Sequence, residues 1–94
     1  MTENVLRDKM EKLLKRELRS LMLKTRAGLD LTQSKMGDRY VMSENSYSAL
    51  ENGEYMCGTL TTIFLLRDQK DPGKVLDEIT EKLEQIREEE LLPL

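Results

Sequence analysis

The sequence predicts an all-α domain of five helices, on the basis of three observations. Apolar residues recur every three or four positions in a long N-terminal segment and again near the C-terminus, as in an amphipathic helix. Two short segments between them each follow a residue that can cap a helix, Thr32 or Ser43. The tripeptide Asp71-Pro72-Gly73 marks another helix start, because Asp caps a helix and Pro fits its first turn.

The first helix is expected from about residue 4 to residue 27, with Gly28 as its end. Its apolar stripe consists of Leu6, Met10, Leu14, Leu18 and Leu21. On the opposite side, basic residues recur at spacings of three and four: Lys9, Lys12, Arg16 and Arg19. This pattern indicates a solvated face, or a surface turned toward phosphates or toward the acidic C-terminal segment.

Residues 32–53 predict two short helices joined by a tight turn. Thr32 caps the first helix, which runs to about Tyr40. Gly37 within it leaves room for another segment to approach closely. Val41 occupies the turn, where a β-branched residue is unfavourable if φ is positive, so we expect a reshaped turn.

The second short helix is capped by Ser43, runs to about Asn52 and ends at Gly53. Its period turns Tyr47 and Leu50 toward the interior. The outward side carries small and polar side chains of the kind that a DNA major groove accepts: Glu44, Asn45, Ser48, Ala49 and Asn52.

This stretch resembles the helix-turn-helix of lambda-repressor/Cro-like transcriptional regulators. The likeness rests on residues in register without a gap: Thr32-Gln33, Gly37, Ser43 and Glu51-Asn52-Gly53. It extends in outline from Leu13 to about Leu66 and implies a five-helix lambda-repressor-like DNA-binding domain. The chain departs from the family at Val41, where Gly is usual, and at Tyr47, where Ile or Val is usual.

The resemblance implies that the second helix lies in the major groove of double-stranded DNA. The implied base contacts are Glu44, Asn45 and Ser48. The implied phosphate contacts are Gln33 and Asn52. Side-chain chemistry agrees, because Asn can pair with adenine and Glu can accept from cytosine, while Ala49 can contact a thymine methyl group. Arg26 is added as a phosphate contact because it lies close in sequence to the Thr32 cap.

A fourth helix is expected from Thr59 to about Asp68, with apolar residues available to the core: Leu60, Ile63, Phe64 and Leu66. Cys57, which precedes it, is expected to be small, inert and partly buried. A fifth helix is expected over residues 73–90, with an apolar seam of Leu76, Ile79, Leu83 and Ile86. This seam is interpreted as a dimer interface, or as closure of the domain's own core, or as both.

The charge distribution divides the chain in two. Residues 1–70 hold 12 Lys and Arg against 10 Asp and Glu, a net of +2, whereas residues 71–94 hold 3 against 8, a net of −5. The first part is predicted to be the helix-turn-helix core, and the second an acidic helix that dimerises or closes the core. This acidic tail is also a possible site for a protein partner.

The composition excludes several kinds of site. The chain has no His and a single Cys, so it cannot form a His-containing catalytic triad, a Cys/His zinc cluster or an intrachain disulfide. We expect neither an enzyme nor a bound cofactor or metal. The sequence shows no signal-peptide pattern and no apolar run of membrane-spanning length, which predicts a cytoplasmic protein.

Together these features predict a homodimeric regulator, and more specifically a repressor, that binds an operator with an inverted repeat. Two alternatives remain. The first is a protein-interaction module on the same scaffold without DNA binding, favoured by the sparse basic charge near Glu44, Glu51 and Glu54. The second is an antitoxin-like regulator whose acidic tail binds a toxin.

Overall fold

The computed structural model describes residues 3–91 and contains five helices and no strand in that range. The helices are α1 (Glu3–Leu29), α2 (Gln33–Arg39), α3 (Glu44–Glu51), α4 (Thr59–Arg67) and α5 (Pro72–Leu91). The prediction of an all-α fold is therefore confirmed. Over the same residues, no helix combines the length and the apolar character that a membrane span requires.

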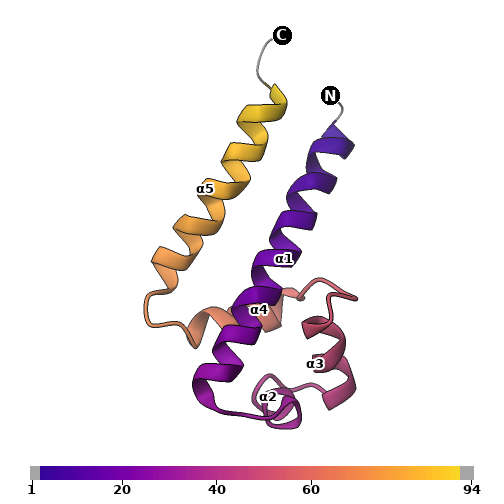
Figure 1. Ribbon diagram of the computed structural model, residues 1–94, viewed down its shortest axis with the longest axis vertical. Coiled ribbons are helices and arrows are strands. Elements are labelled where there is room, and N and C mark those ends of the chain that lie inside the picture. Colours follow the sequence, from indigo (N-terminus) through magenta and orange to yellow (C-terminus); the bar gives the residue numbers. More distant parts are fainter. Residues whose placement is uncertain (1–2, 92–94) are drawn as a thin grey trace.

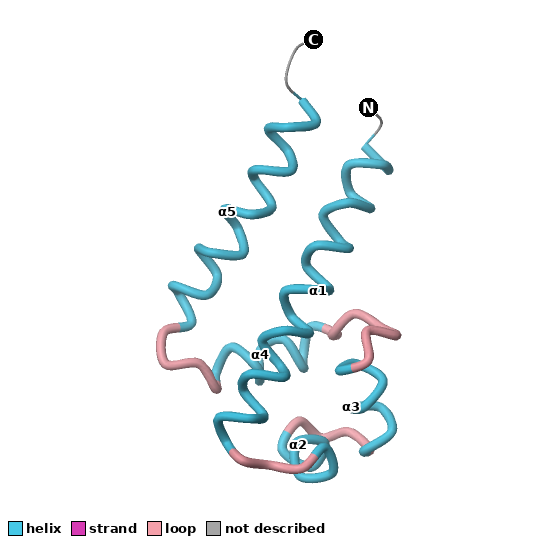
Figure 2. The backbone as a smooth tube through the Cα atoms, in the orientation of Figure 1, coloured by secondary structure: helices cyan, strands magenta, loops and turns pink. Residues whose placement is uncertain are grey.

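The molecule is elongated, with extents of 49 × 26 × 19 Å. Figure 1 shows α1 and α5 running antiparallel along the long axis, with α2, α3 and α4 gathered around the C-terminal half of α1. The tube in Figure 2 shows that only short loops join these elements. The α2–α3 pair therefore lies at one end of the molecule, and α1 and α5 extend from it.

The core lies where α1 meets α2, α3 and α4. Its buried side chains come from α1, α2, α3 and α4, and include Tyr40 directly after α2: Leu18, Met22, Met36, Tyr40, Tyr47, Leu50 and Leu65. The Tyr40 ring stacks on Phe64 with 6.1 Å between ring centroids and meets the Tyr47 ring edge-on at 6.3 Å. These aromatic contacts tie α2 to both α3 and α4.

α1 ends two residues later than the sequence predicts. Gly28 lies inside the helix, and the residue with left-handed backbone is Asp30, with a φ of 54°. The amide of Leu31 donates to the carbonyl of Arg26, and the amide of Asp30 to that of Ala27, which is the Schellman ending. Asp tolerates this conformation better than most residues, so a glycine is not needed there.

α4 differs most from the sequence prediction. Thr61 and Leu65 face the core, whereas Leu60 and Ile63 are 62% and 57% exposed. The expectation that Leu60 and Ile63 join the core is therefore wrong, while Phe64 packs against it. Because apolar residues occupy most positions of this nine-residue helix, its sequence shows no period that could fix the inward side.

α5 begins as predicted, with the amide of Lys74 donating to the Asp71 carboxylate at 3.1 Å. Two ion pairs join α5 to α1: Lys82 with Glu17 at 2.8 Å, and Lys9 with Glu90. The predicted interaction between a basic residue of the first helix and the acidic C-terminal segment thus occurs at Lys9.

Candidate nucleic-acid interface

The α2–α3 pair has the local geometry that the sequence predicts for its helix starts. The Thr32 hydroxyl accepts from the amide of Lys35 at 3.2 Å, and the Ser43 hydroxyl accepts from the amide of Ser46 at 3.1 Å. Each hydroxyl satisfies an amide that the first turn of a helix leaves unpaired. The starts of both helices are therefore fixed by the chain's own side chains.

The turn between α2 and α3 is a regular Schellman turn. Val41 has a φ of 60°, the amide of Met42 donates to the carbonyl of Gly37 at 2.9 Å, and the amide of Val41 donates to that of Asp38 at 3.3 Å. The expectation of a reshaped turn is therefore wrong. The Val41 side chain is 78% exposed, so it accepts an unfavourable backbone conformation without a clash against the core.

Gly37 explains how the turn packs so closely on α2. It is fully buried, and a Cβ atom built on it would lie 2.8 Å from the Met42 carbonyl oxygen and 3.3 Å from backbone atoms of Ser43. Real Cβ atoms do not approach backbone oxygens at that distance. The close approach expected at Gly37 is confirmed, and its partner is the backbone that leads into α3.

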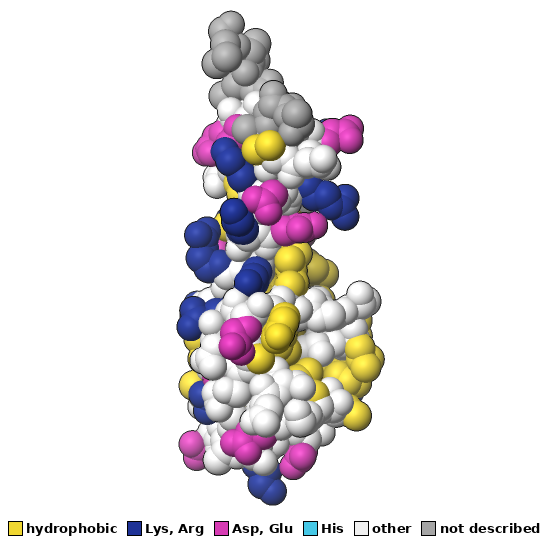
Figure 3. Space-filling model, turned by 90° about the vertical axis from the view of Figure 1, so that its right-hand side faces the viewer, with side chains coloured by type: hydrophobic (Ala, Val, Ile, Leu, Met, Phe, Trp, Pro, Cys, Tyr) yellow, Lys and Arg dark blue, Asp and Glu magenta, His cyan; other side chains and the backbone are white. Residues whose placement is uncertain are grey.

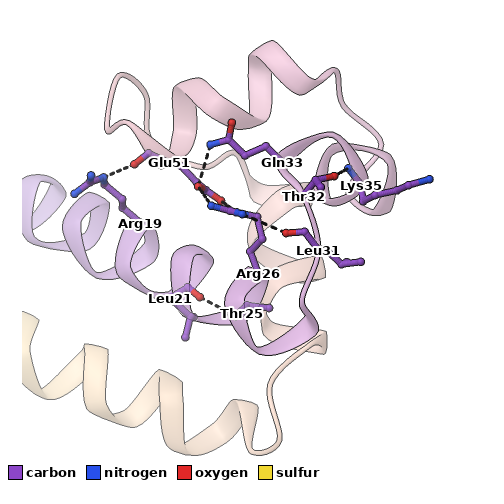
Figure 4. A network of polar contacts seen from close by, with 9 residues as sticks. All are labelled: Arg19, Leu21, Thr25, Arg26, Leu31, Thr32, Gln33, Lys35 and Glu51. Carbon is purple, nitrogen blue, oxygen red and sulfur yellow. Dashed lines mark hydrogen bonds and ion pairs between the residues drawn. The ribbon is translucent and has the colours of Figure 1, made fainter.

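Glu51 is the centre of a polar network that holds α3 against the rest of the domain (Figure 4). Its side chain is only 3% exposed. The Arg26 guanidinium donates to both carboxylate oxygens, at 2.6 Å from Nε and 3.0 Å from Nη2, and the Gln33 amide donates at 3.1 Å. One carboxylate at the end of α3 therefore binds residues of α1 and α2.

The backbone of Glu51 takes part as well. The Arg19 guanidinium donates from Nε to the Glu51 carbonyl, one of the carbonyls that the end of α3 leaves without a helical partner (Figure 4). A cation at a helix C-terminus also interacts favourably with the helix dipole. Arg19 and Arg26, seven residues apart on α1, thus hold the C-terminal end of α3.

This environment keeps Glu51 ionised. Burial alone would raise the pKa of Glu51, but the hydrogen bonds from Arg26 and Gln33 outweigh burial and hold it below its ordinary value. The Glu51 carboxylate in turn raises the pKa of Arg26. Burial beside this carboxylate also raises the pKa of Tyr47, whose hydroxyl has no hydrogen-bond partner among the described residues.

A second network fixes α2 to α4. The Asp68 carboxylate accepts from Arg39 Nε at 2.9 Å, from Arg39 Nη2, and from the Tyr40 hydroxyl at 2.8 Å. These hydrogen bonds, from Arg39 first, lower the pKa of Asp68. The charge of Arg39 is therefore paired within the domain.

The predicted base contacts lie together on the outward side of α3. Glu44 and Asn45 in the first turn are exposed, and Ser48 and Ala49 in the next are half-buried. Asn52 at the end of α3 is also exposed. Nothing in the described part of the chain covers the exposed members, so this side of α3 is open to a partner.

The predicted phosphate contacts are less uniform. Gln33 is half-buried and directs its amide nitrogen to Glu51 (Figure 4). Arg26 uses Nε and Nη2 for Glu51 and Nη1 for the Leu31 carbonyl at 3.2 Å, so all three nitrogens donate within the chain. The phosphate role of both residues stays a prediction, and what the structure shows for Arg26 is pairing within the chain.

Glu51 and Arg19 are the site residues that sequence reasoning missed. A signal for Glu51 exists, because it lies four residues after Tyr47 and therefore shares the inward face of α3. The sequence analysis instead counted Glu51 as surface charge on the reading side. For Arg19 no local signal exists, since its partner is a carbonyl that only the tertiary fold brings near.

The outward charge of this region is modest and mixed. The exposed acids on α2, α3 and the following loop are Asp38, Glu44 and Glu54, and the exposed bases are Lys35 and Arg39, of which Arg39 is paired with Asp68. Figure 3, which views the face that lies to the right in Figure 1, shows charged side chains gathered mainly over the upper part of α1 and sparse over the lower half.

The α5 seam packs mainly within the chain. Ile79 contacts the core cluster, and Leu83 and Ile86 are half-buried on the side of α5 that faces α1, where they border hollows lined by Leu14 and Leu13. Leu76 is 48% exposed. This packing agrees with the core-closing alternative for three seam residues, and the dimer role of the seam stays a prediction.

Comparison of the chain with protein-family models, with curated proteins and with solved structures found no match.

Proposed function

We propose that this protein binds double-stranded DNA sequence-selectively through α3 and regulates transcription as a homodimer. The observation that carries the proposal is the α2–α3 pair itself. Two short capped helices meet across a tight turn, and their buried faces are fixed by Gly37, Tyr47 and Glu51. The opposite side of α3 carries exposed polar residues, in the arrangement that a helix inserted into the major groove requires.

In this proposal the first turn of α3 reads base edges. Asn45 is exposed there and can form a bidentate pair with adenine, and Glu44 can accept from the amino group of cytosine. Ser48 and Ala49 lie one turn further along the same side and supply a hydroxyl and a methyl group. Phosphate contacts come from Gln33 and Asn52, at the two ends of the motif.

The Glu51 network supports this role through rigidity. A base-reading side chain discriminates only if its helix is held at one angle, because a displaced amide loses its bidentate geometry. Arg19, Arg26 and Gln33 hold the end of α3 to α1 and α2. Arg26 therefore acts as a positioning residue, and its loss would disturb the direction of α3.

The substitution Asn45→Ala tests the proposal. It should weaken binding to the preferred duplex by about 1–3 kcal/mol and relax the choice at one base pair. Asn52→Ala is the matched control, since Asn52 is exposed and makes a phosphate contact in this proposal, and it should weaken all duplexes alike. Fluorescence anisotropy on duplexes that differ at single positions measures both. Equal losses on every duplex from both variants would contradict base reading by Asn45.

One observation favours a second candidate function, a protein-interaction module on the same scaffold. The exposed charges around α3 include three acids, Glu44, Glu54 and Asp38, against Lys35 and an Arg39 that is already paired with Asp68. Such a surface repels phosphates unless its acids are satisfied by base amino groups. Absence of duplex binding even at low salt would favour this second function over DNA recognition.

A further inference from the structure

The exposed side of α4 is an unusual apolar surface for so small a domain. Leu60 and Ile63 are 62% and 57% exposed, and Tyr55 in the loop that leads into α4 is 68% exposed. Single exposed apolar residues are normal, but these three fall within nine consecutive positions on one helix and its leading loop. We propose that this side of α4, from Tyr55 to Arg67, is the surface through which two copies of the chain associate.

The charges at the two ends of this α4 surface select a second copy as the occupant. Glu54, beside Tyr55, is exposed at the N-terminal end, and Arg67 is exposed at the C-terminal end. The Arg67 guanidinium lies over the Phe64 ring, 5.1 Å from its centroid, which holds it beside the apolar side chains. The surface therefore runs from acidic through apolar to basic.

Such an order is self-complementary. In a two-fold dimer the same patch serves both copies. When the two-fold axis is perpendicular to α4, the rotation reverses the helix direction, so the two α4 helices lie antiparallel. Leu60 and Ile63 of one copy meet the same residues of the other, and Glu54 of each copy faces Arg67 of the second copy. A partner with uniform charge would meet one favourable and one unfavourable end.

The α5 seam is the competing surface, and it is less available. Ile79, Leu83 and Ile86 are half-buried beside α1, which leaves Leu76 as the exposed large side chain of that seam. The α4 surface also follows α3 after a short loop, so association there keeps both α3 helices in one assembly near the two-fold axis. Only the use of the two α3 helices to read an inverted repeat rests on the proposed function; the association through α4 does not.

Sedimentation velocity of the full chain without DNA tests the proposal, over low to high micromolar concentration. The wild-type chain is expected to be a dimer, and Ile63→Glu is expected to raise its dissociation constant roughly 30-fold or more. Leu76→Glu, a change of an exposed apolar residue on α5, should leave the dimer intact. Far-ultraviolet circular dichroism checks that both variants stay helical. A monomeric wild type, an undiminished Ile63→Glu dimer, or dissociation by Leu76→Glu overturns the proposal.

Charge reversal at the two ends of the α4 surface tests the association even if Ile63→Glu fails to fold. Glu54→Arg and Arg67→Glu each place like charges together twice in a two-fold contact, and each should weaken the dimer about 2- to 30-fold. The double variant with both reversals should recover the wild-type dimer affinity. If the losses of the two single variants simply add in the double variant, the antiparallel contact is overturned. A dimer that binds no duplex would leave the α4 surface intact and refute the proposed function. A monomer that binds duplex would refute both the α4 surface and the homodimer, and would leave DNA recognition by α3 standing.

Discussion

Replacement of Glu51 with Gln is expected to lower the free energy of unfolding by about 2–4 kcal/mol at neutral pH. The carboxylate is 3% exposed and receives three side-chain hydrogen bonds, so its loss leaves the Arg26 guanidinium partly buried beside a neutral amide. Because Arg26 is 28% exposed, water offsets part of that cost. Urea denaturation followed by circular dichroism measures the difference.

The pH dependence of this difference is a second readout of the same substitution. The pKa of Glu51 is lowered in the folded state, so its contribution to stability is present above the unfolded-state pKa of about 4.3 and lost as the pH falls through the folded-state pKa. The gap between the wild-type chain and Glu51→Gln should therefore narrow below about pH 4. The lowered pKa of Asp68 acts equally in both chains and cancels.

Glu44→Gln is the matched control for Glu51→Gln. Glu44 lies in the same helix but is exposed, and its side chain makes no hydrogen bond or ion pair with the described residues, so its substitution should change stability by less than about 0.5 kcal/mol. Equal stabilities of Glu51→Gln and Glu44→Gln at pH 7 would contradict the role assigned to the buried network.

Replacement of Gly37 with Ala is expected to destabilise the domain by about 1–3 kcal/mol. The new Cβ atom would lie 2.8 Å from the Met42 carbonyl oxygen, and Met42 is held in place because its amide donates to the Gly37 carbonyl. In a chain of this size, such a loss lowers the melting temperature by roughly 4–8 °C per kcal/mol. Thermal unfolding of the purified variant measures it.

Gly28→Ala is the matched control for Gly37→Ala. A Cβ atom at Gly28 meets no atom within 4 Å, and the residue lies inside α1, where Ala is favoured over Gly by up to about 1 kcal/mol. The two glycine substitutions should therefore shift the melting temperature in opposite directions. A stabilising effect of Gly37→Ala would refute the close packing of the turn on α2.

The sequence was sufficient for those elements whose signals are local. The caps at Thr32, Ser43 and Asp71 were predicted because a hydroxyl or carboxylate beside a helix start has one nearby set of amides to satisfy. The left-handed residue after α3, Gly53, was also predictable, because glycine adopts a positive φ without a side-chain clash, and its φ is 77°.

Features that depend on distant neighbours were not predictable. Asp30 and Val41 adopt left-handed backbone although glycine is the usual residue, and neither residue type marks such a position in the sequence. The inward side of α4 follows from contacts with α1 and with Tyr40, and a helix with apolar residues at most positions does not encode which side that is. Arg26 was placed near the motif correctly, but its pairing with Glu51 joins residues 25 positions apart.

The measurement that tests the central claim most directly is recovery of the DNA that the protein binds. Genomic fragments are incubated with the purified chain, captured with it, and sequenced against a matched input. We expect enrichment of fragments that share an inverted repeat, with half-sites about one helical turn apart. Salt should weaken binding to the enriched duplex linearly on a log–log plot. Fragments with no shared sequence, together with no duplex binding at low salt, would contradict DNA recognition by α3.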